Sequence, residues 1–352
     1  MVLTACFLII SICVWHDKTE IFVSNIEGGT ESGSEQKDYI KWVDFNVSYE
    51  ALCEAYDWDI KTYNEETYSA HVDWIEVLAC VAAKSGGSFS EKEVKQIREI
   101  SEKLAGGETT IEELTKDLKY YNYYHEAYSA VLSGFVGEYT LVKSDELIED
   151  RKIEETGYGL KAYSPIAKGF PYSDYDDFGV SRSFGYERQH LGHDMMGQIG
   201  TPIIAVESGY VEALGWNRYG GWRIGIRSFD KKRYYYYAHL RQNFPYCKTL
   251  QEGSIVTAGD VIGYMGHTGY SDTENVNNID EVHLHFGIQL IFDESQKDCV
   301  SEIWINPYNI VRFLQRNRTL AKKNEETKEW IRVDDIILPE VEEYMEQQEN
   351  GS

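Results

Sequence analysis

The segment HLHFGIQLI at residues 283–291 decides how this chain is interpreted. Its composition and alternation are typical of a β-strand. In a strand, residues two apart face the same side, so the imidazoles of His283 and His285 point together. Leu284 and Phe286 then point to the opposite face. Two adjacent imidazoles repel each other when both are protonated, and a metal ion removes the conflict by holding one neutral ring as a ligand. Two surface histidines on a polar face are the alternative.

Short segments separated by glycine turns surround this strand and predict an antiparallel β domain over residues 157–320. Pro307 is expected to open a helix near the end of this domain. The other expected strands are residues 203–206, 210–214, 222–226, 234–239 and 261–264.

The chain has a different periodicity before residue 142. Apolar residues recur there at helical spacing, and Ser90 with Glu93 and Thr110 with Glu113 form capping-box patterns. These features predict a helical domain over residues 38–142. The expected fold class is therefore α+β, with an all-α N-terminal domain followed by an antiparallel β-sheet domain. A charged connection over residues 143–155 is expected to flex between them.

The two ends of the chain differ from these domains. Residues 1–15 are apolar but fall short of the roughly 20 residues that cross a bilayer, so they predict a signal peptide or a short membrane anchor. A buried N-terminal strand is the alternative. Residues 16–37 are polar and glycine-containing, as in a linker. Residues 321–352 are expected to form a charged C-terminal tail with some apolar residues that could dock.

The bulk composition excludes some functions. The 352 residues are 42% hydrophobic, which permits a packed core, and the net charge of −25 disfavours nucleic-acid binding. The six cysteines include no C-x-x-C pair, so a thiolate zinc site is not expected. Pairing of Cys247 with Cys299 stays open, as does the oligomeric state.

The remaining histidines extend the candidate site. Six of the nine histidines lie between His190 and His285. His190 and Asp194 offer a nitrogen and a carboxylate ligand, and Gly192 between them gives the backbone freedom to curl around an ion. A turn aspartate beside an unrelated histidine is the alternative. His239 ends a predicted strand, where a single histidine is more often only half-buried.

An ordered set of motifs resembles the M23 peptidases, the lysostaphin/LytM-type metallo-endopeptidases. The set extends over about residues 163–293 and is specific as a combination. The motifs are HLGHD at 190–194, GTP at 200–202, GYV at 209–211, YAHL at 237–240, the glycines Gly253 and Gly259, IG at 262–263, and HLHF at 283–286.

The resemblance implies a groove floored by an antiparallel β-sheet and a zinc site. It assigns His190, Asp194 and His285 as ligands of Zn²⁺, and His239 and His283 as the catalytic pair. Two histidines and one aspartate leave a fourth zinc position for water. His193 points away from Asp194 on an extended chain and stays unassigned.

The resemblance also implies the function, a zinc-dependent endopeptidase that hydrolyses peptide bonds in peptidoglycan. Such an enzyme acts in the cell envelope or outside the cell. The alternative is a non-enzymatic LytM-like scaffold or activator in cell division or sporulation.

The chain departs from the family pattern in two places. An acidic insertion occupies residues 272–281, and Gly287 stands where a glutamate is often found. Both changes can reshape the groove. Six aromatic residues are candidates for its walls, although sheet packing explains most of them: Tyr172, Tyr175, Trp216, Tyr219, Trp222 and Tyr270.

Overall fold

The computed structural model describes residues 39–64, 66–144, 151–184, 186–297 and 301–350. The expected leader (1–15) and linker (16–37) lie outside these residues, as does Cys299. Residues Val43–Ser352 form one compact unit. Within the described residues, no helix is long and apolar enough to cross a membrane.

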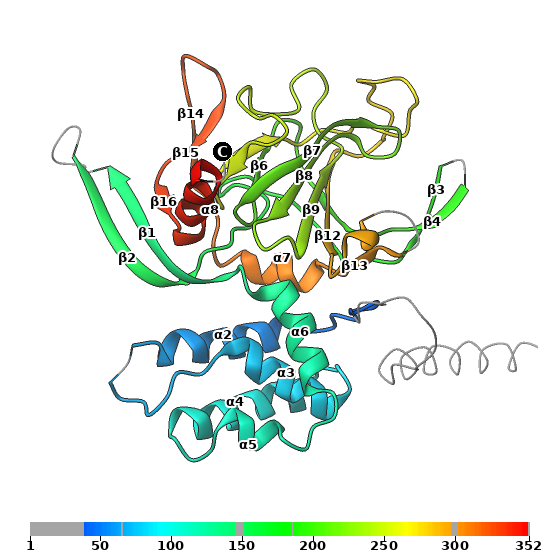
Figure 1. The fold of residues 1–352 in the computed structure, drawn as a ribbon. Coiled ribbons are helices and arrows are strands. Elements are labelled where there is room, and N and C mark those ends of the chain that lie inside the picture. The colour runs from blue at the N-terminus through cyan, green and yellow to red at the C-terminus, as the bar shows by residue number, and fades with distance from the viewer. Residues whose placement is uncertain (1–38, 65, 145–150, 185, 298–300, 351–352) are drawn as a thin grey trace, which may run out of the picture. The chain divides into compact units, whose positions relative to one another are not determined.

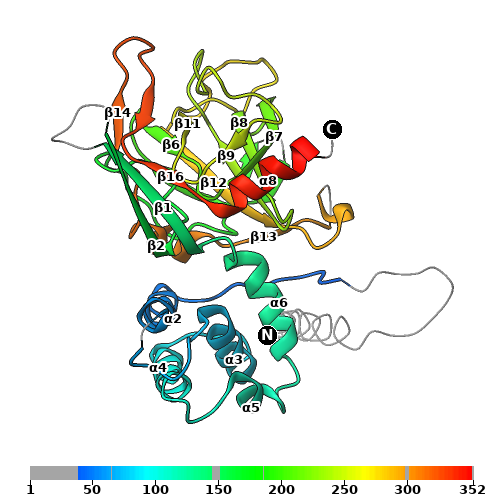
Figure 2. The same cartoon turned by 60° about the vertical axis from the view of Figure 1, so that its left-hand side comes forward.

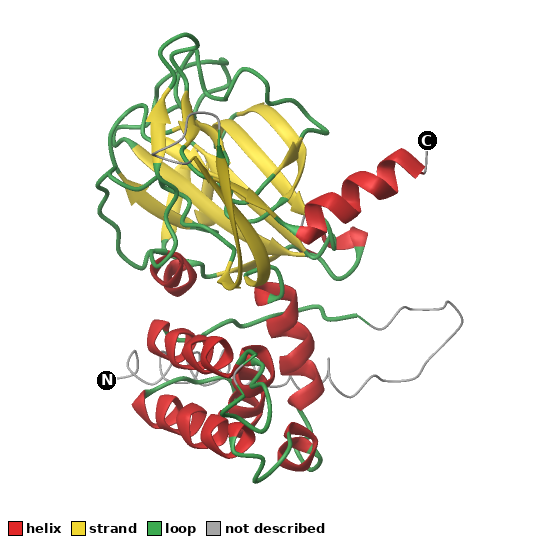
Figure 3. Ribbon diagram, turned by 90° about the vertical axis from the view of Figure 1, so that its left-hand side faces the viewer, coloured by secondary structure: helices red, strands yellow, loops and turns green. Residues whose placement is uncertain are grey.

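Five helices gather at the N-terminal end of this unit, as Figures 1 and 3 show. Both predicted capping boxes are present, with the Ser90 and Thr110 side chains accepting from the backbone and Glu93 and Glu113 bonding back. Gly86 ends a helix in the left-handed conformation that glycine adopts without strain. The helices are α2 (Tyr49–Thr62), α3 (Trp74–Ser85), α4 (Glu91–Ala105), α5 (Ile111–Thr115) and α6 (Tyr121–Leu132).

The largest sheet runs in the order β10-β7-β8-β9-β12-β13, with β5 also pairing with β12. Every strand pair of the described residues is antiparallel, and the six strands expected from the sequence are present. The bounds are β5 (His193–Met196), β6 (Pro202–Ile204), β7 (Gly209–Asn217), β8 (Gly221–Ser228), β9 (Arg233–Ala238), β10 (Ile255–Val256), β11 (Val261–Tyr264), β12 (His283–Leu290) and β13 (Ile303–Ile305). The short helix η1 (Glu294–Gln296) follows β12, and α7 (Tyr308–Leu314) follows Pro307.

A three-stranded sheet contains both ends of the connection that we expected to flex, and residues 145–150 of that connection lie outside the described residues. Strand β1 (Val136–Ser144) begins within the predicted helical range and pairs with β2 (Lys152–Leu160) over nine residue pairs. Four charged residues of the expected connection, Lys143, Lys152, Glu154 and Glu155, therefore lie in these two strands. Charged side chains at an exposed hairpin end are solvated, so their charge alone does not indicate an irregular chain.

The predicted charged tail is largely folded. Strand β16 (Asp335–Ile337) pairs with β1, and Ile336 and Leu338 are buried beside it. Figure 2 shows these strands side by side, with helix α8 following. The elements of this stretch are β14 (Ala321–Lys323), β15 (Trp330–Arg332), β16 and α8 (Pro339–Asn350). The remaining hairpin is β3 (Ser181–Phe184) with β4 (Tyr186–Gln189).

A buried arginine joins the end of α6 to the large sheet. Arg233 on β9 donates to the carbonyl oxygen of Ala130 at 2.7 Å and to the carboxylate of Glu207 at 2.7 and 3.0 Å. Between α2 and α7, the aromatic rings of Tyr56 and Phe313 pack edge to face with their centres 5.3 Å apart. The helices and the sheet therefore share a packed and hydrogen-bonded boundary.

Candidate metal centre and groove

The register of β5 against β12 brings an aspartate and a histidine together. Asp194 lies directly opposite His285, and His193 lies opposite Phe286. Directly opposed residues of antiparallel strands project their side chains to the same face. Asp194 and His285 therefore share the groove face, whereas His193 is turned to the other face, as the sequence predicted.

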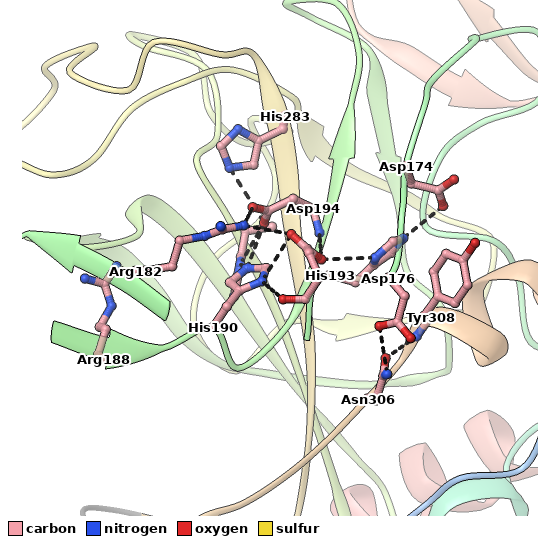
Figure 4. Close-up of polar contacts among 12 residues, drawn as sticks. Asp174, Asp176, Arg182, Arg188, His190, His193, Asp194, His283, Asn306 and Tyr308 are labelled. Carbon is pink, nitrogen blue, oxygen red and sulfur yellow. Dashed lines mark hydrogen bonds and ion pairs between the residues drawn. The ribbon is translucent and has the colours of Figure 1, made fainter. Parts of the chain in front are cut away.

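Three donor atoms converge at this point (Figure 4). His190 Nε2 lies 3.0 Å from Asp194 Oδ1 and 2.8 Å from His285 Nδ1, and Asp194 Oδ1 lies 3.1 Å from His285 Nδ1. A tetrahedral zinc site with bonds of about 2.0–2.1 Å places its donors about 3.3 Å apart. These three residues are positioned to hold a metal ion. The described part of the chain contains no other group of histidines, cysteines or carboxylates placed in this way. The donor set fits zinc.

Hydrogen bonds fix the proton of His190. Its Nδ1 donates to the backbone oxygen of Asp177 at 3.0 Å, which leaves Nε2 to face the other two donors. Burial opposes protonation, but hydrogen bonds to Asp177 and Asp194 outweigh it and raise the pKa of His190 to about 9. A proton and a metal ion therefore compete for Nε2 of this ring.

Asp177 and Arg182 support the donors, and no spacing pattern in the sequence pointed to either residue. The Asp177 carboxylate lies 3.2 Å from His190 Nδ1. The Arg182 guanidinium bridges it to Asp194, at 2.8 Å from Asp177 and 3.2 Å from Oδ2 of Asp194. Burial acts to raise the pKa of Asp194, but hydrogen bonds from His190 and His285 hold it well below its usual range. The carboxylate is thus ionised and oriented with Oδ1 toward the histidines.

His239 and His283 lie beside the donor set, with their ring centres 4.7 Å apart. Each Nδ1 donates to a backbone carbonyl, of Thr268 at 2.9 Å and of Glu281 at 2.8 Å respectively. A carbonyl oxygen only accepts, so each ring keeps Nε2 for the groove. Nε2 of His283 lies 3.7 Å from Asp194 Oδ1. Burial, reinforced by the nearby histidines, holds the pKa of His239 well below its usual value.

The backbone at His239 is strained. Its φ is 60°, and Tyr270, whose ring centre lies 6.0 Å away, has a φ of 46°. Left-handed conformations of residues other than glycine cost free energy and cluster at functional sites. Gly192, in contrast, is not among the residues with positive φ, so the expected need for backbone freedom at this position was wrong.

His193 occupies a separate buried position behind the groove (Figure 4). Its Nε2 lies 2.9 Å from the carboxylate of Asp174, and its Nδ1 lies 3.6 Å from that of Asp177. Its ring packs edge to face against Tyr308. His193 therefore contacts the carboxylate that orients His190, without facing the donor set itself.

An open groove of about 1060 Å³ passes over the three donors and the two histidines beside them. The face of β9 and β12 that bears Tyr236 and His285 lines this groove. Three of the six aromatic candidates, Tyr175, Tyr219 and Tyr270, line it as well. The other three are not among its lining residues, in keeping with ordinary packing.

The groove is lined by an antiparallel sheet and holds three converging donors with two further histidines beside them. This arrangement makes it a candidate metal centre. Residues 188–298 match the model of peptidase family M23.

Two curated relatives and one solved structure illustrate the likeness. The L-Ala–D-Glu endopeptidase of Bacillus subtilis (strain 168) is 36% identical over 174 residues, covering 47% of this chain and 50% of the relative. Lysostaphin of Staphylococcus staphylolyticus is 34% identical over 120 residues, covering 34% of this chain and 21% of the relative. A LytM-type structure from Ruminococcus gnavus has a TM-score of 0.47 at 21% identity, covering 80% of this chain and 92% of that one. The chain thus spans half the length of the first relative and about a fifth of the second.

Proposed function

We propose that the chain is a zinc-dependent endopeptidase that hydrolyses peptide bonds in peptidoglycan. The main observation behind the proposal is that His190, Asp194 and His285 converge in one groove. The same groove also contains His239 and His283. The M23 match over residues 188–298 supports it, as do the names of both relatives.

The proposed ligands are His190, Asp194 and His285. When bound there, zinc supplies a Lewis acid that polarises a carbonyl group and makes water more acidic. Arg182 holds the second carboxylate oxygen of Asp194, which keeps Oδ1 directed at the histidines.

His239 and His283 are the proposed proton-handling residues. With Nδ1 bonded to a carbonyl oxygen, each neutral ring presents the lone pair of Nε2 to the groove. The lowered pKa of His239 keeps that ring neutral at pH 7, so it is ready to accept a proton from water. Once protonated, the same nitrogen donates to an oxyanion or to the leaving amine.

The experiment incubates the zinc-loaded protein with soluble peptidoglycan fragments of different cross-link chemistry and identifies the products by mass spectrometry. The panel includes an L-alanyl–D-glutamyl bond and a glycyl–glycine bond. Cleavage of one bond class, lost on chelation and restored by zinc, is the expected result. A zinc-loaded protein that cleaves no member would contradict the proposal and favour a scaffold or activator.

We further propose that α2–α6 form an all-α domain and that the peptidase domain spans about residues 157–320. We also propose that the protein acts in the cell envelope or outside the cell, where peptidoglycan is found. A reporter fused after residue 37 that is active only in the cytoplasm would contradict the proposed location.

A further inference from the structure

Three arginines line the groove, and they differ in what they contact. Arg182 is bonded to two carboxylates beside the donor set. Arg188 and Arg223 each have a buried Nη1 that lacks a hydrogen-bond partner among the described residues. A buried donor without a partner costs free energy, more so when it carries charge. Each of these two guanidinium groups therefore keeps a donor that no described residue satisfies.

Arg188 lies close to the proposed catalytic pair. It projects from β4, and its Nη2 donates to the hydroxyl of Tyr270 at 2.9 Å. Its Cζ lies 4.8 Å from the ring centre of Tyr219 and 5.1 Å from that of Tyr270. The ring of Tyr270 in turn lies 6.0 Å from that of His239. The ring of Tyr270 thus lies close both to the guanidinium and to a histidine of the proposed catalytic pair.

The two arginines that are buried as whole residues form ion pairs with acids. Arg227 forms ion pairs with Glu212 and Glu294, and Arg233 does so with Glu207 and Asp230. No carboxylate of the described residues pairs with Arg188, although acidic residues outnumber basic ones by 59 to 34 in the chain. The two tyrosine rings near its Cζ attract the guanidinium without neutralising its charge. A planar guanidinium held in this way matches a carboxylate.

We infer that the peptide cleaved in this groove carries a free carboxylate beside the scissile bond, and that Arg188 binds this carboxylate. The inference rests on the proposed endopeptidase function and names the substrate chemistry of the same groove. Arg188 lines the groove, and a carboxylate bound there supplies the acceptor that Nη1 lacks among the described residues.

The test uses two soluble peptides that are identical except for one group beside the cleaved bond, a glutamate carboxylate in one and the glutamine amide in the other. We expect wild-type protein to cleave the acid with kcat/KM about 10-fold to 100-fold higher than the amide. Arg188→Gln should lose this preference by cleaving the acid more slowly, with the amide little changed. Arg188→Lys should keep part of it.

Two further variants serve as comparisons. Arg241 also stacks on an aromatic ring, with its Cζ 4.5 Å from the ring centre of Tyr264, but it does not line the groove. Arg241→Gln should therefore keep the preference. Arg223→Gln removes the other unpartnered guanidinium and should reduce the preference less than Arg188→Gln.

Three results would overturn the inference while leaving the proposed function intact. Wild-type protein could cleave both peptides equally well, Arg188→Gln could retain the preference, or Arg223→Gln alone could abolish it. If wild-type protein with zinc cleaves neither these peptides nor the peptidoglycan fragments, the proposed function fails and the inference falls with it.

Discussion

The imidazole ring of His285 lies against the α-carbon of Gly192. A Cβ at Gly192 would come within 2.5 Å of Cε1 and 2.6 Å of Nε2 of His285, and within 2.8 Å of the backbone oxygen of Phe286. Contacts this short do not occur between real atoms, so any side chain here displaces the ring or the strand. The glycine between His190 and Asp194 therefore makes room for a proposed ligand from another strand.

Gly192→Ala should weaken zinc binding by displacing His285. We expect an affinity loss of tenfold or more, measured by competition with a chromogenic chelator, because supporting changes around metal ligands commonly cost 10-fold to 100-fold. Gly159→Ala is the matched control, since Gly159 lies in β2 without positive φ and a Cβ there would make only ordinary contacts of 3.5–3.9 Å. Unchanged zinc affinity in Gly192→Ala would show that the His285 ring is not a ligand in this position.

His239→Ala and His283→Ala should retain zinc and lose most of the activity. Neither residue belongs to the converging donor set, and removal of a proton-transfer group commonly costs 10²-fold to 10⁴-fold in rate. Elemental analysis checks the zinc content, and the peptide assay checks turnover. Near-normal turnover in both variants, or loss of zinc from either, would refute the assignment of this pair.

Arg233→Met should destabilise the protein by about 3–5 kcal/mol, because it leaves the buried carboxylate of Glu207 without its partner. Urea unfolding provides the measurement. Adding Glu207→Gln should restore part of the stability by removing the unpaired charge. If the double variant is less stable than Arg233→Met, the charge imbalance is not the cause.

Stability should depend on pH through His71. The hydrogen bond that His71 Nε2 donates to the Asp59 carboxylate, at 3.1 Å, raises the pKa of His71 above its ordinary 6.5, although burial acts against this. A raised folded-state pKa stabilises the protein fully below about pH 6.5, and this contribution is lost as pH rises through the folded-state value. The stability difference between wild type and His71→Gln should therefore be larger near pH 5 than near pH 9. His125→Gln, on α6, serves as the control, and a difference that grows with pH would contradict the account.

The sequence predicted the strands of the large sheet because their alternation and glycine turns are local signals. The alternation of side chains along a strand was enough to predict that His283 and His285 share one face and that His193 points away from Asp194. The register of β5 against β12 confirms both predictions. The ligand and catalytic roles came from the motif resemblance and remain proposals.

Asp177 and the hairpin of β1 and β2 could not be found in this way. Asp177 reaches His190 through tertiary packing, and its neighbours Asp174 and Asp176 are equally acidic, so no spacing distinguishes it. The hairpin ends are charged, and its pairing with β16 joins residues almost 200 positions apart, such as Thr140 with Ile337. Both depend on contacts that a local pattern does not contain.

The most direct test of the account compares zinc content and peptide cleavage in wild type, His285→Ala and His125→Ala, each purified with zinc present. The account predicts one zinc per chain and cleavage of peptidoglycan peptides for wild type and His125→Ala. It predicts loss of both properties for His285→Ala, since only two of the three converging donors remain. Stoichiometric zinc or undiminished cleavage in His285→Ala would contradict the proposed metal centre.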